Sequence, residues 1–283
     1  MDKPRNDSAL SNAAVFEVDA VEYRYEDAAA LDGVSLYISS GESVVLLGAN
    51  GSGKSTLLKM LDGLIFPTGG SIKAFGAGLT DDALKDEGFS MSFRQRVGFV
   101  FQNSDAQLFS PTVWDEIAFG PLHLGLSPED VKERTEDTLH ILGLQHLRER
   151  PPYHLSGGEK KKVALASVLA IGPEVLLFDE PTAGLDPKTE SFLIRLILQL
   201  TAAGKTVVTA TQDLRLAAAI ADRVMVLGED HRLAGEGEAS TILGDRELLL
   251  TANLIHDHPH RHGGVEHFHP HSHLKDHHGN EHD

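Results

Sequence analysis

The chain has 283 residues and a formal net charge of −17, from 25 Lys and Arg against 42 Asp and Glu. At about 150 residues per domain this length allows one large or two modest domains, and so acidic a surface disfavours nucleic acid as a partner. The absence of cysteine excludes disulfides, thiolate metal sites and a cysteine nucleophile. Sixteen histidines are the unusual feature of the composition, and eleven of them follow residue 255.

The N-terminal residues 1–14 are polar and lack an apolar run behind basic residues, so they are not typical of a secretory signal. We expect them to form a flexible N-terminus. No window of about 18 apolar residues occurs in the sequence, which predicts that the chain does not itself span a membrane. Any membrane role would then depend on a partner protein.

Apolar runs that read as strands alternate with helical stretches along most of the chain. The predicted strands are 34–38, 43–47, 97–101, 175–178, 206–209 and 224–227. This alternation is typical of a parallel α/β sheet, and the mostly helical block at about 103–160 is predicted to be inserted into it.

A candidate phosphate-binding loop follows the second predicted strand. Residues 48–55 read Gly-Ala-Asn-Gly-Ser-Gly-Lys-Ser, which matches G-x-x-x-x-G-K-[ST] between an apolar strand and a helix. Such glycines let backbone N–H groups surround phosphate oxygens, and the helix dipole adds to the attraction. Lys54 is expected to contact the β- and γ-phosphates of ATP, and Ser55 to bind Mg²⁺. The predicted nucleotide-binding residues of this segment are Gly48, Asn50, Gly51, Gly53, Lys54, Ser55 and Thr56.

Two acidic residues follow the apolar strand 175–178. A strand end beside a phosphate loop is a usual place for a Mg²⁺-binding aspartate, so Asp179 is that candidate. Glu180 would lie on the other side of the strand, where it could polarise an attacking water. An Asp-Glu pair is often only a solvated turn, but the preceding apolar strand and the phosphate loop favour the catalytic interpretation.

A second candidate anion site begins with residues 155–161, Leu-Ser-Gly-Gly-Glu-Lys-Lys, at the start of a predicted helix. With both motifs in this order, residues 15–250 resemble the ATP-binding subunits of ABC transporters. The resemblance implies an α/β fold: a P-loop NTPase core with a parallel sheet, an N-terminal antiparallel β subdomain and an inserted α-helical subdomain.

The resemblance also implies a head-to-tail dimer with a second copy of the chain. In that dimer Ser156 and Gly158 of one copy cover the γ-phosphate of the ATP held by Lys54 of the other. Residues 183–186, Ala-Gly-Leu-Asp, match the loop that crosses the dimer interface, with Asp186 as its acidic residue.

Three further positions resemble family residues around the nucleotide. Tyr25 resembles the aromatic residue that stacks on adenine, with Tyr23 as the alternative and simple strand packing as a third interpretation. Gln102, after the strand 97–101, resembles the glutamine that contacts Mg²⁺ and the attacking water.

One position departs from the family pattern. The family usually has a histidine before an Asp-Leu pair after the strand at 206–209, whereas residues 211–214 here read Thr-Gln-Asp-Leu. Gln212 can form a hydrogen bond with a γ-phosphate oxygen but cannot carry a proton or a charge. We therefore expect slow ATP hydrolysis that still depends on Glu180 and in which Gln212 takes the place of the histidine.

The segment 100–121 indicates a subgroup. It contains Val-Phe-Gln-Asn-Ser-Asp-Ala-Gln-Leu-Phe and later Phe-Gly-Pro, and resembles the ATPases of energy-coupling-factor importers, including the cobalt and nickel systems. The resemblance implies two partners, an integral-membrane transport subunit and a separate substrate-capture subunit. It also implies a peripheral location on the cytoplasmic face of the cell membrane.

The tail, residues 251–283, concentrates the histidines and contains Pro and Gly that oppose a packed helix, so we expect it to be disordered without metal. Alternating imidazoles on such a chain can surround a divalent ion, with Ni²⁺ as the first candidate and Co²⁺ as the second. A purification tag and a solvated segment without ligands are the alternatives. The candidate ligands are His256, His258, His260, His262, His267, His269, His271 and His273.

The combined pattern predicts an ATPase that powers import of a divalent transition metal. One alternative is the ATPase of a vitamin importer whose tail is incidental. The other is a nucleotide-gated metal-storage protein that works without a membrane subunit.

Overall fold

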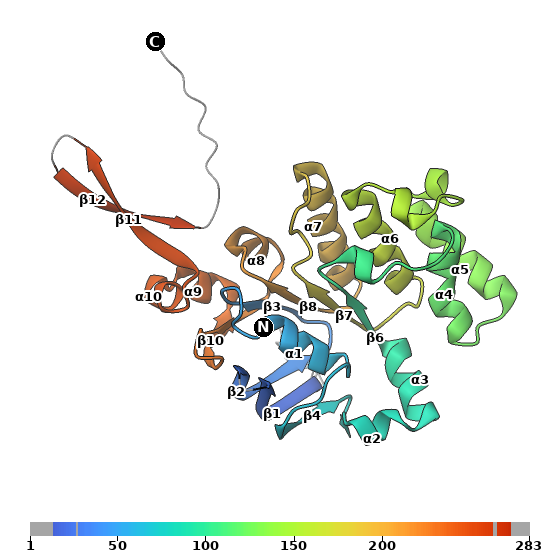
Figure 1. The fold of residues 1–283 in the computed structure, drawn as a ribbon, viewed down its shortest axis with the longest axis horizontal. Helices are drawn as coiled ribbons and strands as arrows, with labels where there is room; N and C mark the ends of the chain where they lie inside the picture. The colour runs from blue at the N-terminus through green and yellow to red at the C-terminus, as the bar shows by residue number, and fades with distance from the viewer. Residues whose placement is uncertain (1–13, 27, 263–264, 273–283) are drawn as a thin grey trace, which may run out of the picture.

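The computed structural model describes residues 14–26, 28–262 and 265–272 (Figure 1). For residues 257–262 and 265–272 it describes the backbone alone. The expected flexible N-terminus, apart from Ala14, and the candidate ligand His273 lie outside the described residues. Among the described residues, no helix is both long and apolar enough to cross a membrane.

The centre of the fold is a six-stranded sheet in the order β10-β9-β3-β8-β7-β6. Four of its five neighbouring strand pairs are parallel, and only β10 pairs antiparallel, with β9. This sheet confirms the predicted parallel α/β core. The strands are β3 (Ser43–Leu47), β6 (Val97–Val100), β7 (Val175–Asp179), β8 (Thr206–Thr211), β9 (Arg223–Leu227) and β10 (Leu233–Glu238).

Alternate residues of each central strand contribute to two separate hydrophobic cores. In β7, Leu176 and Phe178 belong to the core on the helical side, while Val175 and Leu177 belong to the core shared with the second sheet. Both faces are therefore covered, which explains why the central strands read as continuous apolar runs. The helical side is covered by α7 (Pro187–Ala202) and α8 (Leu214–Ile220), with α9 (Ala239–Gly244) and α10 (Arg246–Thr251) near β10.

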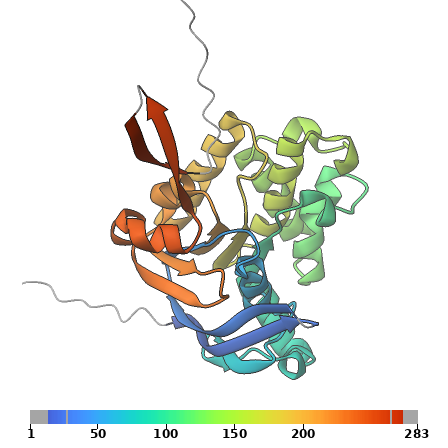
Figure 2. The same cartoon turned by 60° about the vertical axis from the view of Figure 1, so that its left-hand side comes forward.

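The second sheet is antiparallel, in the order β2-β1-β4-β5, and confirms the expected N-terminal β subdomain (Figure 2). Its strands are β1 (Ala14–Tyr25), β2 (Ala28–Ser39), β4 (Gly69–Ala74) and β5 (Ala77–Gly78). Helix α1 (Lys54–Leu61) contributes to the core that both sheets share, and this position explains its nearly complete burial. The short helices α2 (Asp81–Leu84) and α3 (Glu87–Arg96) connect this subdomain to β6.

The segment between β6 and β7 is helical, as predicted. It contains α4 (Val113–His123), α5 (Pro128–Ile141) and α6 (Gly157–Leu169), with short 3₁₀ turns at Ser104–Ala106, Gln145–Leu147 and Pro152–His154. The hydroxyl of Ser127 caps α5 by accepting a hydrogen bond from Asp130 N, and Pro128 occupies the first turn. The N-cap and proline signals in the sequence thus start the helix where expected.

The described part of the tail contains one pair of strands. The structure describes two antiparallel strands, β11 (Ile255–His262) and β12 (Val265–Ser272), which extend away from the body (Figure 1). Histidine recurs at every second position in both β11 and β12. This period of two is also the period with which side chains alternate along a β-strand. In the register His256, His258 and His260 oppose His271, His269 and His267.

Candidate nucleotide site

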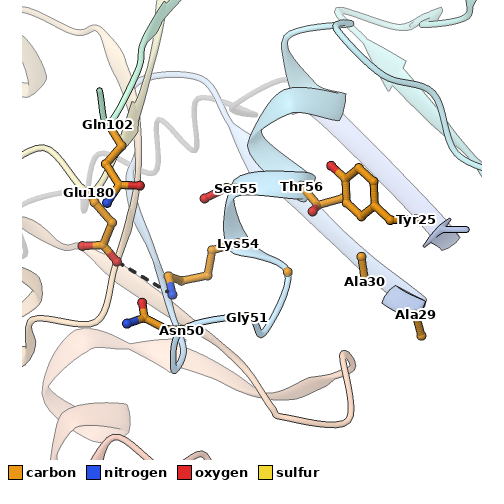
Figure 3. Close-up of a pocket in the computed structure, with 11 residues that line it drawn as sticks. Tyr25, Ala29, Ala30, Asn50, Gly51, Lys54, Ser55, Thr56, Gln102 and Glu180 are labelled. Carbon is orange, nitrogen blue, oxygen red and sulfur yellow. Dashed lines mark ion pairs between the residues drawn. The ribbon is translucent and has the colours of Figure 1, made fainter. Parts of the chain in front are cut away.

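A cavity of about 310 Å³ opens between the two sheets, at the carboxyl end of β3. Figure 3 shows Tyr25 at one end, Glu180 and Gln102 at the other, and Lys54 and Ser55 between them. Most of the predicted site residues line it, together with two alanines that the sequence did not indicate. The lining residues are Tyr25, Ala29, Ala30, Asn50, Gly51, Gly53, Lys54, Ser55, Thr56, Gln102 and Glu180.

The loop between β3 and α1 depends on its glycines. Gly51 and Gly53 have φ of +86° and +107°, a region that side chains rarely adopt. A Cβ on Gly53 would also lie 2.2 Å from Ala30 O. Gly48 does not line the cavity; a Cβ there would meet Ser52 Oγ at 2.4 Å, so its role is to permit the close packing of the loop.

Lys54 is buried at the centre of this loop. Its Nζ donates hydrogen bonds to Gly48 O at 2.7 Å and Ala49 O at 3.0 Å, and lies 3.8 Å from Glu180 Oε1. Burial lowers the pKa of Lys54, while the nearby carboxylates of Glu180 and Asp179 oppose that shift. A phosphate oxygen would give this ammonium a charged acceptor in place of neutral carbonyls, so the position is suited to an anion.

Two oxygen-bearing side chains meet beside the cavity, and a third lines its wall. Ser55 Oγ donates to Asp179 Oδ1 at 2.8 Å, although 124 residues separate them in the sequence, and Gln102 lines the adjoining cavity wall. Hydroxyl, carboxylate and amide oxygens are the hard ligands that Mg²⁺ prefers. The residues present therefore fit a magnesium ion held beside the phosphates.

Glu180 follows β7 with a backbone φ of +41°, and its side chain is 13 % exposed. Burial raises the pKa of this carboxyl, and the neighbouring Lys54 opposes the rise. Its Oε2 accepts a hydrogen bond from Thr211 Oγ1 at 3.1 Å. A carboxylate with a raised pKa beside the ammonium of Lys54 can accept a proton from water.

A sequence model of the family described as "ABC transporter" matches residues 31–183. The chain belongs to the ABC transporter family. It is the ATPase subunit of a transporter, with the P-loop fold and the two sheets expected of that family.

Similar proteins place this ATPase beside importers. The chain is 49 % identical over 243 residues to the nickel import ATP-binding protein NikO of Rhodobacter capsulatus, covering 85 % of this chain and 95 % of NikO. It is 43 % identical over 241 residues to the energy-coupling factor ATP-binding protein EcfA of Methanothermobacter thermautotrophicus, covering 85 % and 76 %. The structure of CbiO1 from Clostridium perfringens, described as part of the ABC transporter complex CbiONQ, superimposes with a TM-score of 0.72 at 34 % identity, covering 85 % and 95 %.

Tyr25, rather than Tyr23, lies at the cavity of this ABC transporter ATPase. Tyr25 is 45 % exposed and lines the cavity. Tyr23 packs against the shared core, and its ring meets that of Tyr25 edge to face at 4.9 Å between centroids. The sequence left both tyrosines open because they lie two residues apart on one strand.

The second anion motif lies outside this cavity. Ser156 caps α6 in a capping box with Glu159, its Oγ lying 2.7 Å from Glu159 Oε2. A Cβ on Gly158 would meet Thr189 Oγ1 at 3.2 Å, so this helix start lies against the start of α7. There Asp186 caps α7 by accepting hydrogen bonds from two backbone N–H groups.

Gln212 has an exposed side chain and does not line the cavity, whereas its neighbour Thr211 contacts Glu180. The sequence did not single out Thr211 or Lys161. The Nζ of Lys161, on α6, donates to Phe101 O at 2.9 Å and Gln102 O at 3.3 Å, and burial lowers its pKa to about 8. The position of Thr211 just after the predicted strand 206–209 was the available signal for a site residue.

Proposed function

We propose that this ATPase powers the import of nickel or cobalt through a membrane complex. One observation carries the proposal: the same chain holds a cavity lined by candidate ATP-binding residues and a hairpin in which histidines oppose histidines. NikO is described as a nickel import protein and CbiO1 as part of a CbiONQ transporter, which supports the same direction. The description of the relative EcfA names no metal. This relative supports the alternative that the chain serves another importer, such as one for a vitamin.

The cavity supports a division of roles in ATP hydrolysis. Tyr25 would stack on adenine at one end, while Lys54 and the loop Asn50–Thr56 would bind the phosphates. Ser55, Asp179 and Gln102 would hold Mg²⁺, which neutralises phosphate charge when bound. Glu180 would accept a proton from the attacking water, and Gln212 would replace the usual histidine near the γ-phosphate.

A second copy of the chain completes this site in the proposal. Ser156 and Gly158 do not line the cavity of their own chain, yet the start of α6 offers backbone N–H groups at a helix N-terminus. In a head-to-tail dimer this helix start would cover the γ-phosphate bound by the partner copy, with Asp186 in the loop at the interface.

We place the membrane partner on the helical subdomain. A cavity of about 330 Å³ there is lined by Leu108, Phe109, Pro111, Pro152 and Tyr153, with Asp105 and Ser110. The side chains of Phe109 and Tyr153 are 67 % and 71 % exposed. An apolar helix of an integral-membrane transport subunit fits this surface, and a separate substrate-capture subunit would complete the importer. The ATPase would then be peripheral, on the cytoplasmic face of the membrane, without a nucleic-acid partner.

The tail hairpin is the proposed metal-binding element. Its register brings His256, His258 and His260 opposite His271, His269 and His267, and positions two apart on a strand share a face. Cross-strand neighbours in an antiparallel pair are typically about 5 Å apart at Cβ. His262 continues the first run, and the metals that suit neutral imidazole include Ni²⁺ and Co²⁺. Among residues whose side chains are described, no cluster of three or more metal-ligand side chains occurs.

Uptake of labelled nickel and cobalt by cells carrying the intact transporter tests the transport function. Lys54→Ala should abolish uptake, because the ammonium that binds the phosphates is lost. Truncation after Ile255 should reduce uptake at limiting metal while leaving it unchanged at saturating metal. Uptake that survives Lys54→Ala would refute the motor role, and labelled vitamin uptake without metal uptake would favour the vitamin importer. Function without any membrane partner would favour metal storage.

Equilibrium dialysis of the full chain against Ni²⁺ tests the tail. A variant with the same tail composition, but with its histidines shuffled out of alternation, is the matched control. We expect the native tail to bind Ni²⁺ at least about tenfold more tightly at pH 7.5 than the shuffled tail. Binding should weaken at pH 5.5, because protons compete with the metal ion for the imidazole nitrogens. Equal affinity of both tails would show that register is irrelevant.

A further inference from the structure

The backbone of Glu180 is held by the neighbouring strand. Its φ of +41° lies in the left-handed region, which is unfavourable for a residue other than glycine. Glu180 N donates to Ala210 O at 2.9 Å, which continues the pairing of β7 with β8 by one residue. Such strained conformations persist where the surroundings determine them, often at functional sites. The position of the Glu180 side chain therefore depends on the end of β8.

The two oxygens of the Glu180 carboxylate have different surroundings. Oε2 accepts the hydrogen bond from Thr211 Oγ1 at 3.1 Å, and the backbone N–H of Gln212 lies close enough to help oppose the rise in the pKa of this carboxyl. Oε1 lies 3.8 Å from Lys54 Nζ and has no hydrogen-bond partner among the described residues. One side of the carboxylate is anchored to the end of β8, and the other is directed towards the phosphate-binding lysine (Figure 3).

The hydroxyl of Thr211 has a defined direction. Thr211 is fully buried as the last residue of β8, and its register partner is Leu47, the last residue before the phosphate loop. Its Oγ1 accepts a hydrogen bond from Asp213 N at 3.1 Å, and Asp213 in turn caps α8. A hydroxyl has one proton to donate, so accepting from Asp213 leaves that proton for Glu180.

From this geometry we infer that Thr211 is a positioning residue, which orients the Glu180 carboxylate for ATP hydrolysis. The inference rests on the proposed role of Glu180 as the group that accepts a proton from the attacking water. The backbone N–H of the neighbouring Gln212 lies on the Glu180 side and favours the charged carboxylate, while the side chain of Gln212 is exposed. In this chain, orientation of the carboxylate thus comes from a threonine hydroxyl and a backbone group, neither of which requires a histidine at position 212.

Thr211→Val and Thr211→Ser test the inference. Valine has the shape of threonine without the hydroxyl, so kcat should fall about tenfold or more, the value expected for one hydrogen bond to a charged group. Because Thr211 is not among the residues that line the cavity, KM and the affinity for ATP should stay within about twofold. Serine keeps the hydroxyl and should restore kcat to within about threefold of the wild type. Loss of ATP affinity in step with kcat, or no rescue by serine, would overturn the positioning role.

Thr209→Val is the matched control. Thr209 lies two residues earlier on β8, is equally buried, and its Oγ1 has no hydrogen-bond partner among the described residues. Removing this hydroxyl should leave kcat unchanged. If Thr209→Val lowered kcat as much as Thr211→Val, the effect would belong to packing of the strand, and the inference would be wrong.

A double variant separates this inference from the proposed role of Glu180. In a Glu180→Gln background, Thr211→Val should cause no further loss in single-turnover hydrolysis, because the group that it positions is already gone. A further loss of the same size would show that Thr211 acts independently of Glu180. Full turnover of Glu180→Gln alone would refute the proposed role of Glu180. A fully active Thr211→Val variant, with hydrolysis still dependent on Glu180, would refute the positioning role of Thr211 alone.

Discussion

Lys54 and Glu180 form a close pair in the cavity wall, with 3.8 Å between Nζ and Oε1. Burial favours the neutral form of each group, so it lowers the pKa of Lys54 and raises the pKa of Glu180. The attraction between the two charges opposes both shifts. A phosphate placed beside the pair would engage Lys54 and add negative charge near Glu180. That charge would raise the proton affinity of the carboxylate, which is what acceptance of a proton from water requires.

At this scale we predict that Glu180→Gln lowers kcat for ATP by about a hundredfold or more, the usual contribution of a general base. Affinity for ATP should be unchanged or higher, because a negative charge near the phosphates is removed. Steady-state phosphate release and equilibrium nucleotide binding would measure the two effects, with the exposed Glu133→Gln as control. Intact turnover would show that another group accepts the proton.

Helix α1 is held at both ends by distant parts of the chain. At its start, Ser55 bonds to Asp179; at its end, Asp62 lies buried and pairs with Arg94 of α3. Arg94 Nη1 lies 2.7 Å from Asp62 O and 3.1 Å from Asp62 Oδ2. Burial raises the pKa of Asp62 to about 7, although Arg94 opposes the rise. The folded protein therefore favours the neutral carboxyl more than the unfolded chain does.

This shift predicts a pH dependence of stability. A carboxyl with a raised pKa in the folded state contributes stability at low pH, and this contribution is lost as pH rises between 3.8 and about 7. Asparagine at this position does not ionise, so Asp62→Asn should not lose this stability as the pH rises. Between pH 5.5 and pH 8 its free energy of unfolding should rise by on the order of 1–3 kcal/mol relative to that of the wild type. Urea unfolding at both pH values measures it. As a control, the substitution Asp137→Asn at an exposed residue should leave the pH dependence of the unfolding free energy unchanged. If Asp62→Asn showed the same pH dependence as the wild type, the prediction would be wrong.

Across the whole molecule, the nucleotide cavity and the proposed membrane-facing surface are linked by α6. This helix begins at the Ser156 cap, and its Lys161 bonds to the carbonyls of Phe101 and Gln102. The chain beyond Gln102 leads directly into the exposed aromatic surface, where Phe109 and Phe119 meet edge to face at 4.9 Å. A partner seated on that surface would therefore contact the segment that follows a residue of the proposed Mg²⁺ site.

This arrangement predicts the effect of a charge in the docking surface. Phe109→Asp should abolish copurification with the membrane subunit and any stimulation of ATP hydrolysis by it, because an apolar contact gains a buried charge. Hydrolysis by the isolated ATPase should stay within about twofold, since Phe109 is 67 % exposed and does not line the nucleotide cavity. Ile141→Asp, at a residue 66 % exposed on α5, is the matched control. A stable complex with Phe109→Asp would place the partner elsewhere.

The sequence by itself determined those features that local physics encodes. Residues close together in the sequence are enough to recognise the glycines of a loop, the apolar strand before Lys54 and the helix cap at Ser127. The phosphate loop, the parallel sheet and the helical insertion were therefore predictable. Contacts between distant segments were not, because a pattern of period two or 3.6 does not state which strands become neighbours. Only the tertiary structure decided that Asp179 lies behind Ser55, that Tyr25 rather than Tyr23 lines the cavity, and that Thr211 bonds to Glu180. The tail shows the same division: its alternating histidines are a property of the sequence, and their opposition across a hairpin is a matter of register.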